Sequence, residues 1–340
     1  MVNKVKVGIL GAGTWSVALA RMLSNAGKSV TVWSALEEEI DTLSTTRRHP
    51  VFSDVELPLE IVFTKSISNA CVGMDCIVFA VPSLYVREIA RMAAPYISSG
   101  QTIVDVAKGI EEETLFTMTQ IIADEIKNPE VRLVALSGPT HAEEVIKDLP
   151  TTIVSASDDY EAALFVQNLF TTPCFRVYTH DDVLGVELCG AMKNIIGLAS
   201  GISSGLGFGD NAKAAIITRG IAEISRLGMA MGCREQTFAG LAGFGDLIVT
   251  ATSMHSRNNQ CGMLIGGGMP AKEAIKKVGM VVEGINALPA ALKLSKKYNV
   301  EMPIVEAVGA IVSGEVDISE VMYLLMTREL KAETQTEASV

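Results

Sequence analysis

The stretch VGILGAGTWS, residues 7–16, decides the fold. Its first four residues are mainly apolar and predict a short buried strand, after which Gly11 allows a sharp turn into a helix predicted at Ser16–Ala26. Gly13 lets the backbone approach a pyrophosphate, which the free N–H groups of a helix N-terminus would bind. Ser16 replaces the third glycine of the usual pattern but is small enough for close helix–strand packing. At the head of a strand–helix–strand unit this turn indicates a dinucleotide site, and an ordinary tight turn is the alternative.

The first half of the chain alternates apolar strand candidates with helical stretches. Strands are predicted at Val5–Leu10, Ser29–Trp33, Cys76–Val81, Thr102–Val106, Val131–Leu136 and Thr151–Ser155. Because these runs are almost wholly apolar, they are typical of parallel strands that helices cover on both faces. The first half therefore predicts an α/β fold, namely a doubly wound Rossmann-type domain.

The second half, from Asp181 onward, consists of long segments rich in Ala, Leu, Ile and Met, with almost no strand signal. Helices are predicted at Leu184–Gly201, Lys213–Leu227, Ala271–Lys276, Asn286–Tyr298, Ile304–Ser313 and Ser319–Met326. We expect two domains, a dinucleotide-binding domain at residues 1–180 and an all-helical substrate-binding domain at residues 181–340. The polar tail from Ala332 onward is expected to fray.

Composition excludes several classes of function. Hydrophobic residues make up 49% of the 340 residues, enough for two cores, and no uninterrupted apolar run is long enough to cross a bilayer. The net charge of −11 and the absence of a basic run argue against a nucleic-acid partner. The six cysteines form no CxxC pair and have no histidine cluster beside them. We therefore expect free thiols, a cytoplasmic protein without membrane insertion, and no metal site.

Two lysines stand where a ligand could reach them. Lys108 follows the predicted strand TIVDV, and the C-terminal ends of parallel strands face the ligand crevice, although a solvated loop lysine is the alternative. Lys193 shares one helical stripe with small residues that recur every four positions, at Gly185, Cys189, Gly197 and Gly201. The stripe leaves room for a ligand or for a second backbone, and a lysine that extends to solvent beside a helix crossing is the alternative.

Polar residues in two later segments complete the candidate site. Asp246, between apolar segments, could pair with a buried lysine or cap the helix that follows, and the two roles are compatible. Ser256 has the character of an N-cap, with Arg257 and Asn258 in the first helical turn. Backbone donors, a guanidinium and an amide would together bind a phosphate there, while a simply capped surface helix is the alternative.

Several longer segments are distinctive. They include GAGTWSVALA at 11–20, AVPS at 80–83, KGIEEET at 108–114, LSGPTHAEEV at 136–145, FRVYTHDDVLGVELCGAMKNIIGLASGI at 175–202, TFAGLAGFGDLIVTATS at 237–253, SRN at 256–258 and VVEG at 281–284. In these segments, and over nearly its whole length, the sequence resembles the bacterial NAD(P)-dependent glycerol-3-phosphate dehydrogenases. The resemblance implies reduction of dihydroxyacetone phosphate to sn-glycerol 3-phosphate, with NAD or NADP as cofactor, for glycerophospholipid synthesis.

The same resemblance implies residue roles. Lys193 matches the catalytic lysine, with Lys108 and Asp246 beside it. The residues implied in substrate binding are Lys108, Gly138, Thr140, Lys193, Asp246, Ser256, Arg257 and Asn258. The residues implied in cofactor binding are Gly11, Gly13, Thr14, Trp15, Lys108, Ala142, Arg257, Val281 and Glu283. Lys108 would lower the pKa of Lys193 and Asp246 would raise it, and the sequence leaves the net direction open.

The sequence departs from the family where cofactor choice is set. Ala35 stands where the family often has Arg or His, and Glu37 comes late for an acid that reads the ribose hydroxyl. The segment then has no residue that recognises either the ribose 2′-hydroxyl of NAD or the 2′-phosphate of NADP, unless Arg47 and Arg48 fold back and bind the phosphate. After SRN the family continues with basic and aromatic residues, where this chain has Asn259, Gln260 and Cys261.

Two other functions remain open from the residues alone. A reductase for a hydroxyacid or hydroxyacyl substrate would need a carboxylate or thioester reader in place of the phosphate-binding SRN segment. A non-catalytic dinucleotide sensor would lack the lysine at position 193. For the dehydrogenase that the resemblance implies we expect a homodimer, although no residue pattern identifies its interface.

Overall fold

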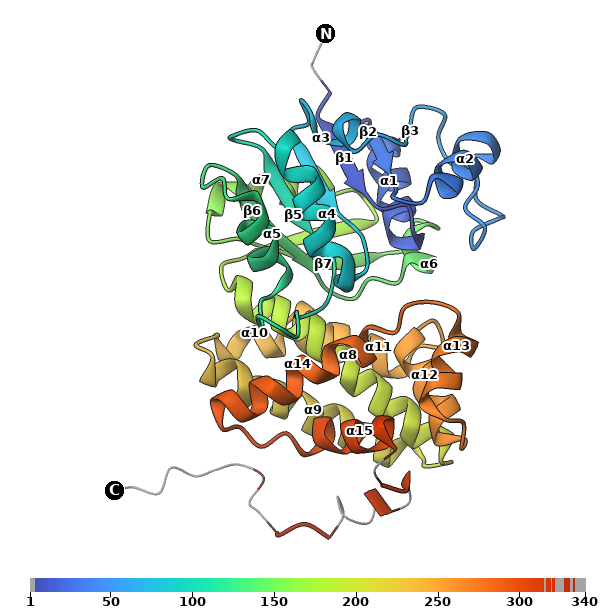
Figure 1. Ribbon diagram of the computed structural model, residues 1–340, viewed down its shortest axis with the longest axis vertical. Helices are drawn as coiled ribbons and strands as arrows, with labels where there is room; N and C mark the ends of the chain where they lie inside the picture. The colour runs from blue at the N-terminus through green and yellow to red at the C-terminus, as the bar shows by residue number, and fades with distance from the viewer. Residues whose placement is uncertain (1–3, 315, 319, 322–326, 331–332, 334–340) are drawn as a thin grey trace.

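The computed structural model describes residues 4–314, 316–318, 320–321, 327–330 and 333, and it consists of a sheet-containing half and a helical half (Figure 1). The helix expected at residues 319–326 and the tail from Ala332 fall almost wholly outside these described residues. The last strand of the sheet-containing half ends at His180, and the first helix of the helical half begins at Val183.

Eight strands form one sheet in the first half. They are β1 Lys6–Leu10, β2 Ser29–Trp33, β3 Val62–Thr64, β4 Cys76–Phe79, β5 Thr102–Asp105, β6 Arg132–Ser137, β7 Thr151–Ala156 and β8 Phe175–His180. Their order across the sheet is β3-β2-β1-β4-β5-β6-β7-β8. All neighbours are parallel except β6 and β7, which pair antiparallel. The prediction of a Rossmann-type α/β half is confirmed, whereas the expectation that its strands are all parallel is wrong at β7.

The connection that precedes β7 contains little helix. A parallel crossover usually contains a full helix. Between Ser137 and Thr151 the chain forms only the one-turn helix α6, Ala142–Val145, and β7 returns beside β6 in the opposite direction. The sequence analysis also missed β3, which has three residues, and β8, whose first four residues alternate between buried and exposed.

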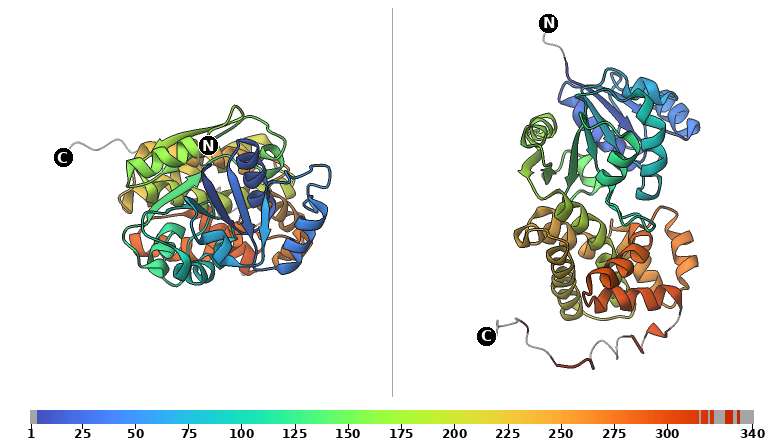
Figure 2. Two further views of the ribbon diagram at one scale, coloured as in Figure 1. Left: turned by 90° about the horizontal axis from the view of Figure 1, so that it is seen from above. Right: turned by 60° about the vertical axis from the view of Figure 1, so that its left-hand side comes forward.

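Helices cover both faces of the sheet (Figure 2). They are α1 Thr14–Asn25, α2 Glu37–Thr46, α3 Ile67–Cys71, α4 Val86–Ala93, α5 Met118–Ile126 and α7 Tyr160–Phe170, together with α6. On one face, Ile9 packs in a cluster with Leu19 of α1 and Phe170 of α7. On the other face, Ile77 packs in a cluster with Ile89 of α4. Successive strand residues point to opposite faces, so two covered faces require apolar residues at nearly every strand position.

The second half is helical throughout its described residues. Its helices are α8 Val183–Gly205, α9 Asp210–Ala230, α10 Glu235–Ala239, α11 Asp246–Thr252, α12 Arg257–Gly266, α13 Ala271–Val278, α14 Glu283–Tyr298 and α15 Pro303–Ser313, with a π-helical turn at Leu241–Gly245. α8 is the central helix, and in the described residues it alone is long and apolar enough as a single helix to span a membrane. Because 89% of its apolar window is buried inside the protein, its length and apolar character serve the core.

The glycine stripe on α8 admits other helices. A Cβ at Gly201 would collide with the backbone oxygen of Asn259, and a Cβ at Gly262 with the backbone oxygen of Leu198. A Cβ at Gly197 would lie 2.6 Å from the Thr250 methyl group on α11. Of the two explanations that the sequence left open for this stripe, a second backbone is the correct one at Gly201.

The contact between α8 and α12 should not tolerate a methyl group. Gly201→Ala should lower the free energy of unfolding by about 1–3 kcal/mol, because overpacking forces the two backbones apart. Gly209→Ala is the matched control, since a Cβ at Gly209 would meet open space. Urea unfolding of both variants measures the difference, and equal midpoints would contradict the proposed close packing.

Candidate active site

The turn between β1 and α1 is open to a ligand. Gly11 has φ +119°, and a Cβ there would lie 2.5 Å from the Ala80 carbonyl oxygen, so this position requires glycine. Gly13 is the N-cap of α1, has no side chain to cap the helix, and faces open space. Ser16 is fully buried and donates a hydrogen bond of 2.9 Å to the Ala80 carbonyl oxygen. The serine therefore ties the turn to β4, and the free N–H groups of α1 remain available to an anion.

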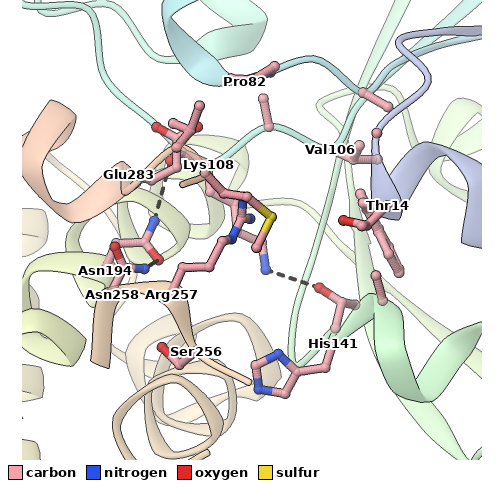
Figure 3. A pocket seen from close by; sticks show the side chains of 18 of the residues that line it. Thr14, Pro82, Val106, Lys108, His141, Asn194, Ser256, Arg257, Asn258 and Glu283 are labelled. Atoms are coloured by element: carbon pink, nitrogen blue, oxygen red, sulfur yellow. Dashed lines mark hydrogen bonds between the residues drawn. The ribbon is translucent and has the colours of Figure 1, made fainter. Parts of the chain in front are cut away.

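A cavity lies between this turn and the helical half (Figure 3). The predicted site residues that line it are Gly13, Thr14, Trp15, Lys108, Thr140, Ala142, Lys193, Ser256, Arg257, Asn258, Val281 and Glu283. Gly11, Gly138 and Asp246 lie outside its lining. The structure thus brings residues from the glycine turn, from the ends of β5 and β6, and from helices of both halves to one place.

Asp246 joins the two lysines. Its Oδ1 accepts a hydrogen bond of 2.7 Å from Lys193 Nζ, and its Oδ2 accepts one of 2.7 Å from Lys108 Nζ. Lys108 also donates to the Gly138 carbonyl oxygen at 2.9 Å and to Thr140 Oγ1 at 3.1 Å. Asp246 is 2% exposed and does not line the cavity, so its carboxylate is buried behind the two lysine side chains that do.

Burial decides the direction that the sequence left open for Lys193. The net effect lowers the pKa of Lys193 to about 8: loss of hydration is the largest cause and the Lys108 charge adds to it, while Asp246 opposes the shift only in part. Burial alone would raise the pKa of Asp246, but the ammonium groups of Lys108 and Lys193 hold it below its ordinary value. The site therefore holds an ionised Asp246 beside Lys193, and it is Lys193 that can gain or lose a proton near pH 8.

Two polar residues of this site were missed by the sequence analysis. Thr250 Oγ1 lies 2.5 Å from Lys193 Nζ, one helical turn after Asp246 on α11. Asn194 accepts a hydrogen bond from Asn258 Nδ2 at 3.0 Å and donates to the Gly190 carbonyl oxygen at 3.1 Å. The spacing of four residues between Asp246 and Thr250 was a usable signal, whereas nothing in the sequence pairs Asn194 with Asn258.

The N-terminus of α12 carries the predicted phosphate-binding residues. Ser256 Oγ accepts a hydrogen bond from the Asn259 backbone N–H at 3.2 Å, as the N-cap prediction requires. Asn258 Oδ1 accepts from the Gly284 backbone N–H at 2.8 Å, so its side chain joins α8, α12 and α14. Arg257 lines the cavity and makes no hydrogen bond or ion pair with the residues described by the structure. Its guanidinium is free to bind an anion.

Glu283 ties the helical half to the sheet. Its carboxylate accepts a hydrogen bond of 2.9 Å from the Ser83 backbone N–H and one of 2.5 Å from Ser83 Oγ. Ser83 belongs to the AVPS turn that follows β4, so this contact closes the cavity beside the glycine turn. Ala142, the first residue of the one-turn helix α6, also lines the cavity.

The comparisons with known proteins agree over both halves. Residues 6–163 match the family model "NAD-dependent glycerol-3-phosphate dehydrogenase N-terminus", and residues 182–323 match the corresponding C-terminus model. This chain belongs to that family. It is 62% identical to glycerol-3-phosphate dehydrogenase [NAD(P)+] 2 of Lactobacillus delbrueckii subsp. bulgaricus, over 96% of this chain and 98% of the relative.

More distant members of the family cover the chain equally well. Glycerol-3-phosphate dehydrogenase [NAD(P)+] of Fusobacterium nucleatum is 47% identical over 98% of this chain and 99% of its own length. The crystal structure of glycerol-3-phosphate dehydrogenase from Coxiella burnetii superposes with a TM-score of 0.91 at 33% identity, covering 96% of this chain and 99% of that one. The family and its Rossmann-type fold are therefore established for this chain.

Because the guanidinium of Arg257 is unpaired among the described residues, we expect the cavity to bind oxyanions. Inorganic phosphate should raise the thermal unfolding midpoint in proportion to its occupancy, since a ligand at tenfold its Kd adds about 1.4 kcal/mol to stability. Arg257→Ala should lose most of this shift. Arg234→Ala is the control, because Arg234 pairs with Asp181 at the surface at 2.6 Å and does not line the cavity. Retention of the full shift in Arg257→Ala would contradict the assignment.

Proposed function

We propose that this protein reduces dihydroxyacetone phosphate to sn-glycerol 3-phosphate and supplies the product for glycerophospholipid synthesis. The observation that carries the proposal is the Lys108–Asp246–Lys193 group, which lies between the open glycine turn of α1 and the free guanidinium of Arg257. A turn that would hold a cofactor, a lysine that would donate a proton and an arginine that would bind a phosphate thus border one cavity. A carboxylate or thioester substrate would not explain why Arg257, Ser256 and a helix N-terminus lie together.

The glycine turn fits a nicotinamide dinucleotide, which supplies the hydride of the reaction. Gly11 and Gly13 keep side chains away from the N-terminus of α1, where the pyrophosphate would lie. Thr14 and Trp15 line the same wall, and Ala142, Val281 and Glu283 line the cavity beyond it. We assign these residues to cofactor binding, with Lys108 and Arg257 close to both ligands.

Lys193 holds the proton that the reaction needs. As the carbonyl carbon of the substrate is reduced, its oxygen gains negative charge, which a protonated Lys193 stabilises before it gives up its proton. In the reverse direction, neutral Lys193 takes the proton of the hydroxyl group. Asp246 and Thr250 hold the ammonium in place, and Lys108 lies beside it, bonded to Gly138 and Thr140. We assign Ser256, Arg257 and Asn258 to the phosphate end of the substrate.

Three broader statements complete the proposal. Residues 1–180 form the cofactor domain and residues 181–340 the substrate domain. The protein acts in the cytoplasm, consistent with cysteines that are free among the described residues. It assembles as a homodimer, which a measurement of molar mass in solution tests.

Removal of Lys193 should abolish most of the chemistry. Lys193→Ala should lower kcat about 10²–10⁴-fold, the usual cost of losing a general acid, while cofactor binding remains close to that of the wild type. Because protonated Lys193 serves the reduction, kcat for reduction should fall as pH rises through about 8, and kcat for oxidation should rise over the same range. Steady-state assays in both directions measure these profiles.

Lys276→Ala is the control, because Lys276 is exposed on α13 and lies away from the cavity. Wild-type kcat in Lys193→Ala, or the same pH profile in both proteins, would show that Lys193 is not the proton donor.

The segment after β2 should favour NADH. Ser34 donates a hydrogen bond of 2.6 Å to Glu39 Oε2, and Glu37, Glu38 and Glu39 form the first turn of α2, an unfavourable field for a 2′-phosphate. Arg47 donates to the Ile61 carbonyl oxygen at 2.8 Å and lies over the Phe63 ring, so it is already engaged.

NADH should therefore be used as well as NADPH or better, as kcat/KM for each cofactor will show. Arg47→Ala and Arg48→Ala should leave the ratio unchanged, since Arg48 is also occupied, by the Ser53 carbonyl oxygen at 2.7 Å. A preference for NADPH of about a hundredfold, or 2.7 kcal/mol, would overturn this prediction.

A further inference from the structure

Two histidines meet at the cavity, and no role has yet been given to either. His141 precedes α6 in the sheet-containing half, and His255 precedes the phosphate-binding residues of α12 in the helical half. Their ring centroids are 5.9 Å apart in an edge-on arrangement, and both residues line the cavity. In Figure 3 the His141 ring extends into the space that Ser256 faces from α12. His141 therefore faces the start of α12 from the sheet-containing half.

The ring of His141 lacks hydrogen-bond partners. Its Nε2 is buried and unpaired. Nδ1 is not among the buried unpaired atoms and has no hydrogen bond in the described part of the chain, so it is the ring nitrogen that can reach a ligand in the cavity. An unpaired buried polar atom destabilises the folded protein, whereas an apolar ring would make the contact with His255 without that cost. A buried polar group without a partner calls for a functional explanation, and the cavity beside it is built for an anion.

The charges around His141 favour an anion in the cavity. Burial lowers the pKa of His141, and the ammonium groups of Lys193 and Lys108 lower it further, against the opposing pull of Glu143 and Glu144 on its own helix. His255 faces it from the loop before α12, and Arg257 lines the same cavity. A phosphate dianion would reverse this balance, because it offsets the neighbouring cations and accepts a hydrogen bond from the ring.

We propose that His141 is a further substrate-binding residue, whose imidazole donates a hydrogen bond to the phosphate of the three-carbon substrate from the sheet-containing half, while Arg257 binds it from the helical half. This inference rests on the proposed function, because it assumes a phosphorylated substrate. The phosphate is then held from both halves of the protein: by Arg257 and the N-terminus of α12 on one side, and by the loop that follows β6 on the other. The edge-on contact with His255 orients the His141 ring.

His141→Phe tests the assignment, since phenylalanine keeps an aromatic ring against His255 but has no donor. KM for dihydroxyacetone phosphate should rise roughly ten- to a hundredfold, the cost of a lost hydrogen bond to a charged group, with kcat changed much less. For dihydroxyacetone, which has no phosphate, kcat/KM should stay within about twofold of the wild type. His141→Gln retains a donor and should recover part of the lost affinity.

His180→Asn is the matched control, because His180 lies outside the cavity and asparagine can still accept the Asp182 backbone N–H that His180 Nδ1 accepts at 3.0 Å. An equal loss of kcat/KM with both substrates in His141→Phe would show that the histidine pair only positions the two halves, and would overturn the inference. An unchanged KM for dihydroxyacetone phosphate in an active His141→Phe enzyme would also overturn it. Failure of the proposed function would be seen in a different experiment, because the wild-type protein itself would then not reduce dihydroxyacetone phosphate.

Discussion

The buried carboxylate of Asp246 is the interaction on which the rest of the site depends. One oxygen binds the ammonium of Lys193 on α8 and the other binds that of Lys108, which follows β5. Two ammonium groups that approach one another away from water repel strongly, and each also loses its hydration. A single carboxylate between them, 2% exposed, lets both remain at the cavity and joins the sheet to the helical half.

That arrangement gives an acidic protein a cationic cavity. The chain carries a net charge of −11, yet the cavity gathers Lys108, Lys193 and Arg257, and Asp246 only partly balances the two lysines. The N-termini of α1 and α12 also border it, and their free backbone N–H groups add to the positive field. Because low-dielectric walls focus such a field, an anionic substrate and an anionic cofactor are attracted to the same opening despite the charge of the whole molecule.

Close helix packing fixes where Lys193 lies relative to Arg257. Gly201 and Gly262 let the backbones of α8 and α12 touch, and Gly197 makes room for Thr250 of α11. Lys193 on α8 is thereby held at one distance from Arg257 at the start of α12, since neither helix can slide without breaking these contacts. The network through Asn194, Asn258 and the Gly284 backbone ties α14, and with it Glu283, to the same pair of helices.

The sequence alone determined the class of the fold and much of the cavity wall. A glycine turn between an apolar strand and a helix has one common use, and continuous apolar strands must be covered on both faces, so local chemistry was sufficient there. Most of the site residues singled out from the sequence line the cavity, but their presence there does not by itself test the roles assigned to them.

Only the tertiary structure decided the rest, because each remaining feature joins residues far apart in the chain. The edge strands β3 and β8 are short or alternating, and only the pairing of β7 with β6 shows that β7 runs antiparallel. The direction of the Lys193 pKa shift depends on burial, which a sequence does not display. The meeting of His141 with His255 joins loops more than a hundred residues apart, and no periodicity links them. Local patterns set the elements, whereas desolvation and long-range pairing set the chemistry.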